Sequence, residues 1–203
     1  MFTNILFFGA GAAGSNTLLN IVRDLPTVNV GIVDYDKIEM RNIITGTQPY
    51  GRSDLNKFKT QVLSMNVYSN TKDGTRLSTL NKKIESQDDI KLALDLFKDG
   101  STLIVDCFDN SESRNLLYNA KDPRIFDILH IGFSEQLSGE VCWNDIWTPM
   151  TEIVSTFDIC TSQGARSFII TLTGLASTII SDYYFNNKKR NIYFDRTLNL
   201  KIF

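Results

Sequence analysis

Three glycines close to the start of the chain constrain its fold more than any other feature. They are Gly9, Gly11 and Gly14, directly after an apolar run at residues 5–8, and a one-sided apolar helix pattern follows at residues 12–25. In such a strand–turn–helix, glycines permit a tight turn, close approach of a phosphate and close helix–strand packing, while the helix N-terminus offers free N–H groups. The pattern therefore predicts phosphate binding, although a tight turn without any ligand would use the same glycines.

Strand-like and helix-like patterns alternate along the chain, which is typical of a parallel sheet with helices on both faces. We predict an α/β fold in a single domain over residues 1–203, with a Rossmann-like, mostly parallel sheet, a short antiparallel strand section and a long C-terminal helix. The predicted strands are residues 4–8, 28–33, 77–84, 101–106, 125–133 and 139–143, and the predicted helices are residues 12–25, 59–68, 89–97 and 163–185. The pattern at residues 191–203 predicts a hairpin. Residues 36–58 form a long polar segment with little periodicity, and loops of that length in compact domains are usually functional.

Acidic side chains follow two of the predicted strands. Asp34 ends the second strand, 20 residues after Gly14, where a carboxylate accepts hydrogen bonds from ribose hydroxyls. Asp106, Asp109 and Asn110 come at the end of the fourth strand, at the edge where ligands bind in open α/β sheets. Because Mg²⁺ takes one or two carboxylates plus phosphate oxygens, Asp109 is a candidate ligand. This second acidic cluster favours ATP over a nicotinamide dinucleotide, unless Asp106 and Asp109 only cap the helix that follows.

Four segments in order make the chain resemble the ThiF/MoeB/HesA superfamily, the adenylating enzymes related to ubiquitin activation. In this chain they read GAGAAGSN, VDYDKIEMRN, NKFKTQVL and VDCFDNSESR. The residues that keep the family spacing are Asp34, Asp36, Ile38 and Asn42 in the second segment and Asp106, Asp109, Asn110 and Arg114 in the fourth. The resemblance extends over residues 3–185 and implies a ThiF-like ATP-binding domain.

The resemblance also implies a reaction and a site. Family members use ATP and Mg²⁺ to adenylate the C-terminal carboxylate of a ubiquitin-like protein, a sulfur-carrier protein or a short peptide ending in glycine, and they release pyrophosphate. By resemblance, Asn42 and Lys59 contact the phosphates as catalytic residues, and Asp109 binds Mg²⁺. The implied cofactor-binding residues are Gly9, Gly11, Gly14, Asp34, Asp36 and Asn110. Independently of the resemblance, the positive charge of a lysine favours binding of a polyphosphate. The alternative is that Lys59 is only a solvated side chain on the first turn of a helix.

The chain departs from the family pattern at several positions. Thr45 stands where the family usually has an arginine, so that Arg41 or Arg52 would have to replace it. The paired CxxC zinc site is absent from the sequence, and no N-terminal helix with a dimer-crossing arginine precedes the first predicted strand. Arginines normally stabilise the transition state of adenylyl transfer. A second hypothesis is therefore a catalytically reduced nucleotide-binding or partner-binding module that works in a heterodimer.

The cysteines and the histidine give weaker signals. Cys160 precedes the long predicted helix, and a helix N-terminus lowers the pKa of a thiol, so Cys160 is a possible nucleophile. The alternative is a former zinc ligand that has lost its partners. Cys107 and Cys142 lie in predicted strands and are expected to pack there. His130, the single histidine, is expected in the core rather than in a catalytic triad.

Charge and hydropathy bear on partners and compartment. A net charge of −2 predicts no nucleic-acid footprint. The first residues lack a charged leader, and we expect no apolar stretch of the roughly 18 residues that span a bilayer, so the protein is expected in the cytoplasm without membrane contact. The apolar residues 169–180 need a cover, either the hairpin at residues 191–203 or a second copy. We expect a homodimer with Phe168, Ile169 and Leu172 or their neighbours at its interface. In such a dimer Arg52 or Arg166 could reach the opposite site.

Overall fold

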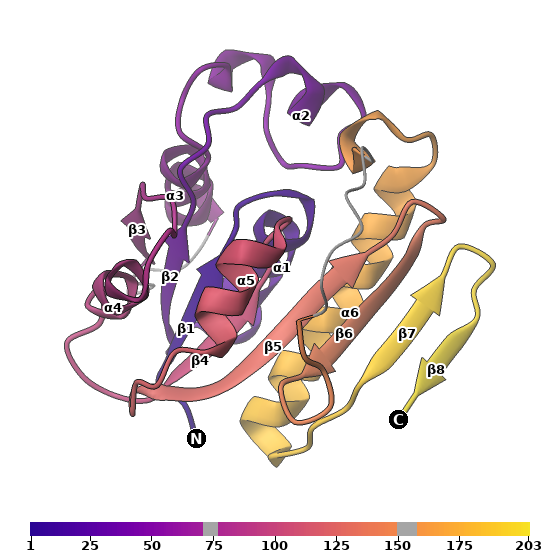
Figure 1. Cartoon of the computed structure of the whole chain (residues 1–203). Coiled ribbons are helices and arrows are strands. Elements are labelled where there is room, and N and C mark those ends of the chain that lie inside the picture. The colour runs from indigo at the N-terminus through magenta and orange to yellow at the C-terminus, as the bar shows by residue number, and fades with distance from the viewer. Residues whose placement is uncertain (71–76, 150–157) are drawn as a thin grey trace.

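Eight strands form one sheet within the residues that the computed structural model describes, which are 1–70, 77–149 and 158–203 (Figure 1). The order across the sheet is β3-β2-β1-β4-β5-β6-β7-β8. The strands are β1 (Asn4–Phe8), β2 (Asn29–Val33), β3 (Leu77–Leu80), β4 (Thr102–Asp106), β5 (Ile125–Phe133), β6 (Ser138–Trp143), β7 (Ile192–Asp195) and β8 (Leu200–Ile202).

The strands from β3 to β5 across the sheet pair in parallel. From β5 onward, the pairs β5–β6, β6–β7 and β7–β8 are antiparallel. β1 lies between β2 and β4 and is buried along its whole length, which explains its continuous apolar sequence. The chain leaves β1 toward β2 and β3 and then returns to β4 on the other side, so the strand order reverses at β1. Ligands bind at the carboxyl ends of the strands at such a point. The predicted Rossmann-like fold with a later antiparallel section is confirmed.

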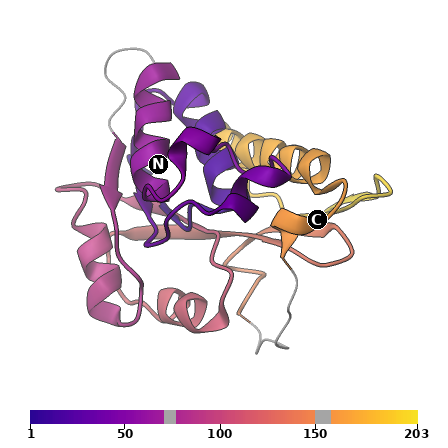
Figure 2. The same cartoon turned by 90° about the horizontal axis from the view of Figure 1, so that it is seen from above.

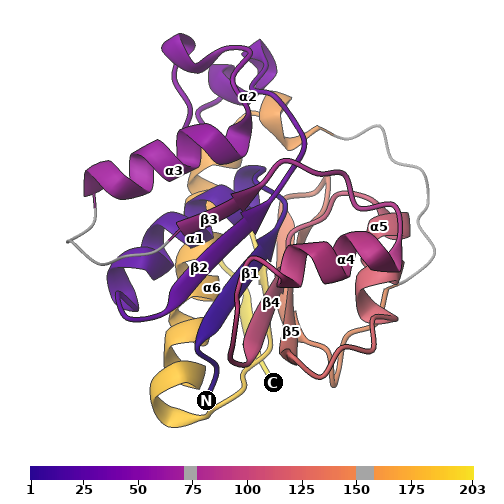
Figure 3. The ribbon, with the colours of Figure 1, turned by 90° about the vertical axis from the view of Figure 1, so that its left-hand side faces the viewer.

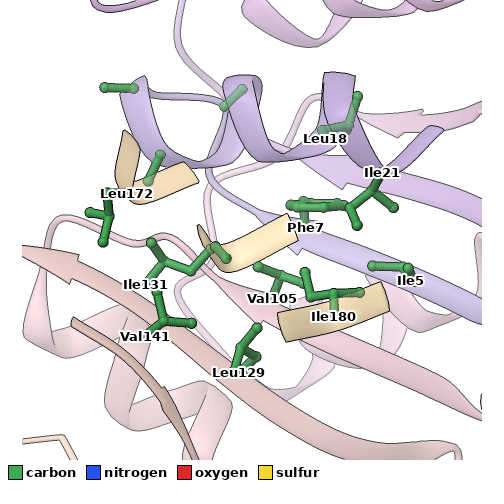
Figure 4. Close-up of a cluster of buried hydrophobic side chains, with 14 of the residues drawn as sticks. Ile5, Phe7, Leu18, Ile21, Val105, Leu129, Ile131, Val141, Leu172 and Ile180 are labelled. Atoms are coloured by element: carbon green, nitrogen blue, oxygen red, sulfur yellow. The ribbon is translucent and has the colours of Figure 1, made fainter. Parts of the chain in front are cut away.

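Helices cover both faces of the sheet (Figures 2 and 3). α1, α3 and α6 lie on one face, whereas α4 and α5 lie on the other. The helices are α1 (Ala12–Asp24), α2 (Met40–Ile44), α3 (Lys59–Asn70), α4 (Gln87–Leu94), α5 (Ser111–Tyr118) and α6 (Ala165–Asn186), with 3₁₀ turns η1 (Arg52–Asp54) and η2 (Ile159–Thr161). Two apolar clusters result, and Figure 4 shows the larger, where Phe7 and Val105 of the sheet meet Leu18 of α1 and Ile180 of α6.

The long helix α6 is covered by its own chain. Phe168, Ile169 and Leu172 are buried, and the Phe168 ring stacks on Phe194 of β7 with 5.7 Å between ring centroids. The β7–β8 hairpin was one of the two predicted covers. The prediction that these three α6 residues lie at an interface between two copies is wrong, because the fold of one chain already buries them. The homodimer itself stays a prediction.

A hydropathy expectation also needs correction at α6. By length and composition this helix is long and apolar enough to cross a membrane, the single such helix in the described ranges, although we expected no segment of this kind. Half of its apolar stretch is buried inside the structure, where it packs against α1 and the sheet. A core helix buried in this way needs the same apolar composition, and the packing accounts for it.

Several predicted segments differ in their bounds from those observed, and α4, for example, spans Gln87–Leu94 rather than residues 89–97. β3 ends at Leu80 rather than at residue 84, because Leu80 pairs with Val33, the last residue of its neighbour β2. The segment at residues 36–58 is not irregular throughout. It contains α2 and η1, and a bridge between Lys37 and Phe58 closes its two ends.

Candidate functional site

The glycine turn between β1 and α1 combines two crowded glycines with an open one. Gly9 has a φ of 105°, and a Cβ on Gly14 would lie 1.9 Å from the carbonyl oxygen of Gly9. A side chain at position 14 would therefore collide with backbone. A Cβ on Gly11 would meet no atom within 4 Å. Since the described protein leaves this space open in front of the α1 N-terminus, it fits a ligand that approaches the backbone closely.

Asp34 follows β2 and braces the glycine turn. Its Oδ2 accepts a hydrogen bond from the Ala10 N–H at 2.6 Å, and its Oδ1 accepts one from the Asp36 N–H at 2.7 Å. Burial raises the pKa of the Asp34 carboxyl, against the opposing effects of Lys59 and of these two N–H groups. Each carboxylate oxygen keeps a second lone pair for a further donor. Asp34 is thus able to accept from ribose hydroxyls, and that role stays a prediction.

Lys59 begins α3 and is buried beside the same acidic residues. Its Nζ donates to Oδ2 of Asp36 at 2.7 Å. Burial lowers the pKa of Lys59, but Asp34 and Asp36 outweigh that effect, so that the pKa is raised and the amine stays charged. The alternative of a solvated lysine is wrong, because the side chain is almost wholly buried. The site thus holds a positive charge next to the glycine turn.

The segment between β2 and α3 is fastened to the glycine turn above the carboxyl ends of the parallel strands (Figure 1). The Tyr50 hydroxyl donates to the carbonyl of Ala10 at 2.7 Å, and the Asn16 side chain donates to the carbonyl of Thr47 at 2.8 Å. Sequence analysis missed Tyr50. The sequence shows only a tyrosine in a polar segment, and its burial, which requires a partner for the hydroxyl, is visible only in the structure.

The structure brings Asn42 and Cys160 together. Asn42 lies in α2, where its Oδ1 accepts from the Glu39 N–H at 2.8 Å and its Nδ2 faces the Cys160 sulfur at 3.9 Å. Cys160 is buried in η2, and the Gln48 side chain donates to its sulfur at 3.0 Å. Asn42 therefore joins α2 to η2. Its phosphate contact and the nucleophilic role of Cys160 stay predictions.

Asp109 and Asn110 form the turn from β4 into α5. Asn110 caps α5, accepting from the Ser113 N–H at 2.8 Å, so the cap belongs to neither of the two acidic residues considered for it. Asp109 is exposed at the carboxyl edge, where it remains available to a ligand. Within the described ranges, no three His, Cys, Asp or Glu side chains gather around a possible metal position. A Mg²⁺ ion at Asp109 would therefore need oxygen ligands from the nucleotide.

A cavity of about 640 Å³ opens beside this turn. Its walls come from the residue after Asp34, from the segment between β3 and α4, and from α5. The lining residues are Tyr35, Lys83, Ile84, Glu85, Gln87, Asp109, Asn110, Glu112, Ser113, Asn115, Leu116 and Asn119. The volume lies within the range of small-molecule sites, and the walls are largely polar.

A buried charged cluster lies behind the Asp109 turn, and sequence analysis did not foresee it. Asp106 is fully buried, and its Oδ2 lies 2.9 Å from Nδ1 of His130 and 3.3 Å from Nε of Arg114. The His130 ring stacks on Trp147 with centroids 3.7 Å apart. The expectation of a core position for His130 is confirmed. A buried Asp–His pair with an arginine shows no local sequence pattern.

The sequence matches one family of known proteins. A sequence model of the ThiF family matches residues 2–129. No curated protein is similar enough in sequence to match the chain.

Solved structures of two proteins share the fold. A crystal structure of E. coli MccB with MccA-N7isoASN superposes with a TM-score of 0.72 at 11% identity, covering 99% of this chain and 64% of that one. MccB with ATP gives 0.70 at 11% identity, covering 99% and 63%, and selenomethionine PaaA gives 0.68 at 11%, covering 99% and 63%. The chain spans less than two thirds of the length of these structures, and at this identity the likeness shows the fold alone.

Proposed function

Because the chain belongs to the ThiF family, we propose that it adenylates the C-terminal carboxylate of a peptide or small carrier protein with ATP. The carboxylate oxygen attacks the α-phosphorus, the bond between the α-phosphorus and the bridging oxygen breaks, and the products are an acyl-adenylate and pyrophosphate. The alternative acceptors within this proposal are a ubiquitin-like or sulfur-carrier protein and a short peptide ending in glycine. MccB, which shares the fold, has been solved with ATP and with MccA, and this favours a peptide.

The observation that carries the proposal is the open space at Gly11 next to a buried lysine. The backbone N–H groups at the start of α1 would bind phosphate oxygens, because no side chain stands between them and a ligand. Lys59 would offset the negative charge that grows on the phosphates during the attack. Asp36 holds the Lys59 amine at 2.7 Å, so that little reorganisation is needed when the nucleotide binds.

The adenosine and the metal ion would lie along the same sheet edge. Asp34 would accept from the ribose hydroxyls, and the cavity between Tyr35 and Asn110 has room for the base. Asp109 would hold Mg²⁺, which neutralises phosphate charge when it is bound. Asn42 of α2 would contact the phosphates, as the family resemblance implies. ATP use favours the cytoplasm as the compartment.

The test is ATP–pyrophosphate exchange with the full chain and Mg²⁺. The probes are synthetic peptides and a carrier protein that end in glycine, and the matched control for each is its C-terminal amide, which lacks the attacking carboxylate. We expect exchange with a free carboxylate and none with the amide. Absence of ATP binding by calorimetry at millimolar nucleotide would refute the proposal.

A second candidate function is a catalytically reduced binding module, and the position of Thr45 favours it. Thr45 stands where the family has an arginine, and its hydroxyl lies 3.2 Å from that of Thr47. Arg166 donates to the carbonyl of Gly46 at 2.8 Å, while Arg41 pairs with Glu39 and Asp158. Arg52 is exposed on η1, and full activity would need a homodimer in which Arg52 reaches the site of the other copy. Bound ATP without exchange, in a chain that light scattering shows to be monomeric, would support the reduced module.

A further inference from the structure

The carboxylate of Asp106 shapes the turn that carries Asp109. Its Oδ1 accepts a hydrogen bond from the Phe108 N–H at 3.1 Å, while its Oδ2 faces His130 and Arg114. Because Asp106 is fully buried, its charge depends on these partners for compensation. The hydrogen bond to Asp106 thereby fixes the backbone at Phe108, the residue directly before Asp109.

Arg114 holds the same turn from its other side. Its Nη2 donates to the carbonyl of Phe108, while its Nε faces Asp106. Both backbone polar groups of Phe108 are thus bound by side chains that also contact each other. The peptide unit that leads into Asp109 therefore has little freedom to turn unless Arg114 or Asp106 moves.

Trp147 covers this arrangement from the segment that follows β6. Its indole is stacked on His130 at 3.7 Å with 13° between the planes, and the Arg114 guanidinium lies 5.6 Å from its ring centroid. Its Nε1–H donates to Oε1 of Glu140 in β6 at 2.8 Å. One side chain therefore contacts both His130 and Arg114, the two neighbours of the Asp106 carboxylate, and is itself anchored to the sheet.

We infer that Trp147 is a positioning residue for the Asp109 turn, acting through His130, Arg114 and Asp106. With the indole in place, His130 and Arg114 are confined against the Asp106 carboxylate, and the Phe108 peptide is fixed. Without the indole, the side chains of His130 and Arg114 are free to move away from Asp106, and the hydrogen bonds to the Phe108 backbone weaken. The functional part of this inference, a better-held Mg²⁺ at Asp109, rests on the proposed function.

The test compares Trp147→Leu with Trp147→Phe, which keeps a ring to stack but loses the bond to Glu140. Phe185→Leu is the control, because Phe185 is an exposed aromatic residue of α6. Amide hydrogen exchange, followed by NMR, reports the Phe108 N–H directly. We expect about tenfold faster exchange of this amide in Trp147→Leu, a smaller change in Trp147→Phe and none in the control.

Two further measurements complete the test. Arg114→Lys keeps the positive charge but loses the planar guanidinium group that contacts Asp106 and Phe108 together. This variant should therefore speed up hydrogen exchange of the Phe108 N–H even if Trp147→Leu does not fold. In calorimetry the Mg²⁺ concentration for half-maximal ATP binding should rise severalfold in Trp147→Leu, with metal-free ATP binding unchanged. Unaltered Phe108 exchange in the folded variants would overturn the inference. Failure of the unmodified chain to bind ATP would refute the proposed function instead. Amide hydrogen exchange at Phe108 would still decide whether Trp147 positions the Asp109 turn.

Discussion

The amine of Lys59 lies 2.7 Å from Oδ2 of Asp36, with the lysine side chain 8% exposed and the aspartate side chain 39% exposed. The pair therefore reaches from the interior to the surface at the carboxyl end of β2. A buried lysine that keeps its charge needs a carboxylate close by, and Asp36 and Asp34 provide two. The positive charge is in position before any ligand arrives.

Replacing this lysine should weaken nucleotide binding, and it should also lower the stability of the fold because the buried Asp34 loses a neighbouring positive charge. We expect Lys59→Met to reduce Mg·ATP affinity about 10- to 100-fold, because a charge-assisted hydrogen bond contributes about 1.5–3 kcal/mol. Lys57→Met is the matched control, since Lys57 is two residues away and pairs with Asp54 at 3.2 Å. Calorimetric titration of both variants is the measurement. Equal affinities in the two would show that Lys59 has only a structural role.

The glycine turn offers a pair of substitutions with opposite expected effects. In Gly14→Ala the added Cβ meets the carbonyl of Gly9, so we expect a loss of stability of about 3 kcal/mol or more. In Gly11→Ala the added Cβ meets no atom within 4 Å, so the free energy of unfolding should change by less than about 1 kcal/mol. ATP affinity should nevertheless fall at least about tenfold in Gly11→Ala, because the methyl group occupies the space in front of the N–H groups. Thermal unfolding and calorimetry separate the two effects, and full ATP affinity in Gly11→Ala would argue against a phosphate in that space.

Much of the parallel half of the fold follows from local sequence. Residues 5–8 and 103–105 are continuous apolar runs, which suit strands buried on both faces, and the glycine motif gives the turn between β1 and α1. Because parallel strands end at a common edge, the positions of Asp34 and Asp109 at that edge could also be predicted.

Contacts between distant segments could not be predicted in the same way. Tyr50 reaches Ala10 across 40 positions, and Asn42 reaches Cys160 across 118. Neither contact belongs to a strand ladder or a helical repeat, so no local periodicity records it. The cover of α6 was left open for a related reason, because an apolar helix has the same sequence whether Phe194 or a second copy packs against it.

The hairpin cover predicts a stability effect at β7. Phe194 is buried against Phe168, whereas its neighbour Tyr193 points to the opposite face and is partly exposed. We expect Phe194→Ala to lower the free energy of unfolding by about 3 kcal/mol and Tyr193→Ala by less than about 1 kcal/mol. Urea denaturation measures both. Similar values for the two variants would mean that the hairpin adds little to the core.

The turn of the same hairpin should respond to acid. Hydrogen bonds from Thr197 and Asn199 lower the pKa of Asp195 from 3.8 to about 2. A depressed folded pKa means that the contribution of Asp195 to stability is complete above pH 3.8 and is lost as the pH falls toward 2. Carboxyl-carbon NMR should therefore show Asp195 titrating near pH 2, and Asp195→Asn should remove this part of the acid sensitivity. A midpoint near 3.8 would contradict the turn geometry.

The last prediction concerns the three thiols and tests whether Cys160 acts as a nucleophile. Burial raises the pKa of Cys142 to about 12, with a further contribution from Glu140, and burial raises the pKa of Cys107 well above its ordinary value. At pH 8 only about one Cys142 thiol in ten thousand is ionised, and the thiolate is the reactive form. Cys160 is also buried, and the side chain of Gln48 covers its sulfur.

We therefore expect a thiol-specific disulfide reagent at pH 8 to modify the native protein slowly and all three cysteines quickly in guanidinium. Cys160→Ser should keep the pyrophosphate exchange of the unmodified chain, because adenylation needs no thiol. One fast-reacting cysteine in the native protein, mapped to Cys160 by mass spectrometry and lost in Cys160→Ser, would contradict this expectation. It would support Cys160 as a candidate acceptor of the activated acyl group, since an accessible thiolate is the form that attacks an acyl-adenylate.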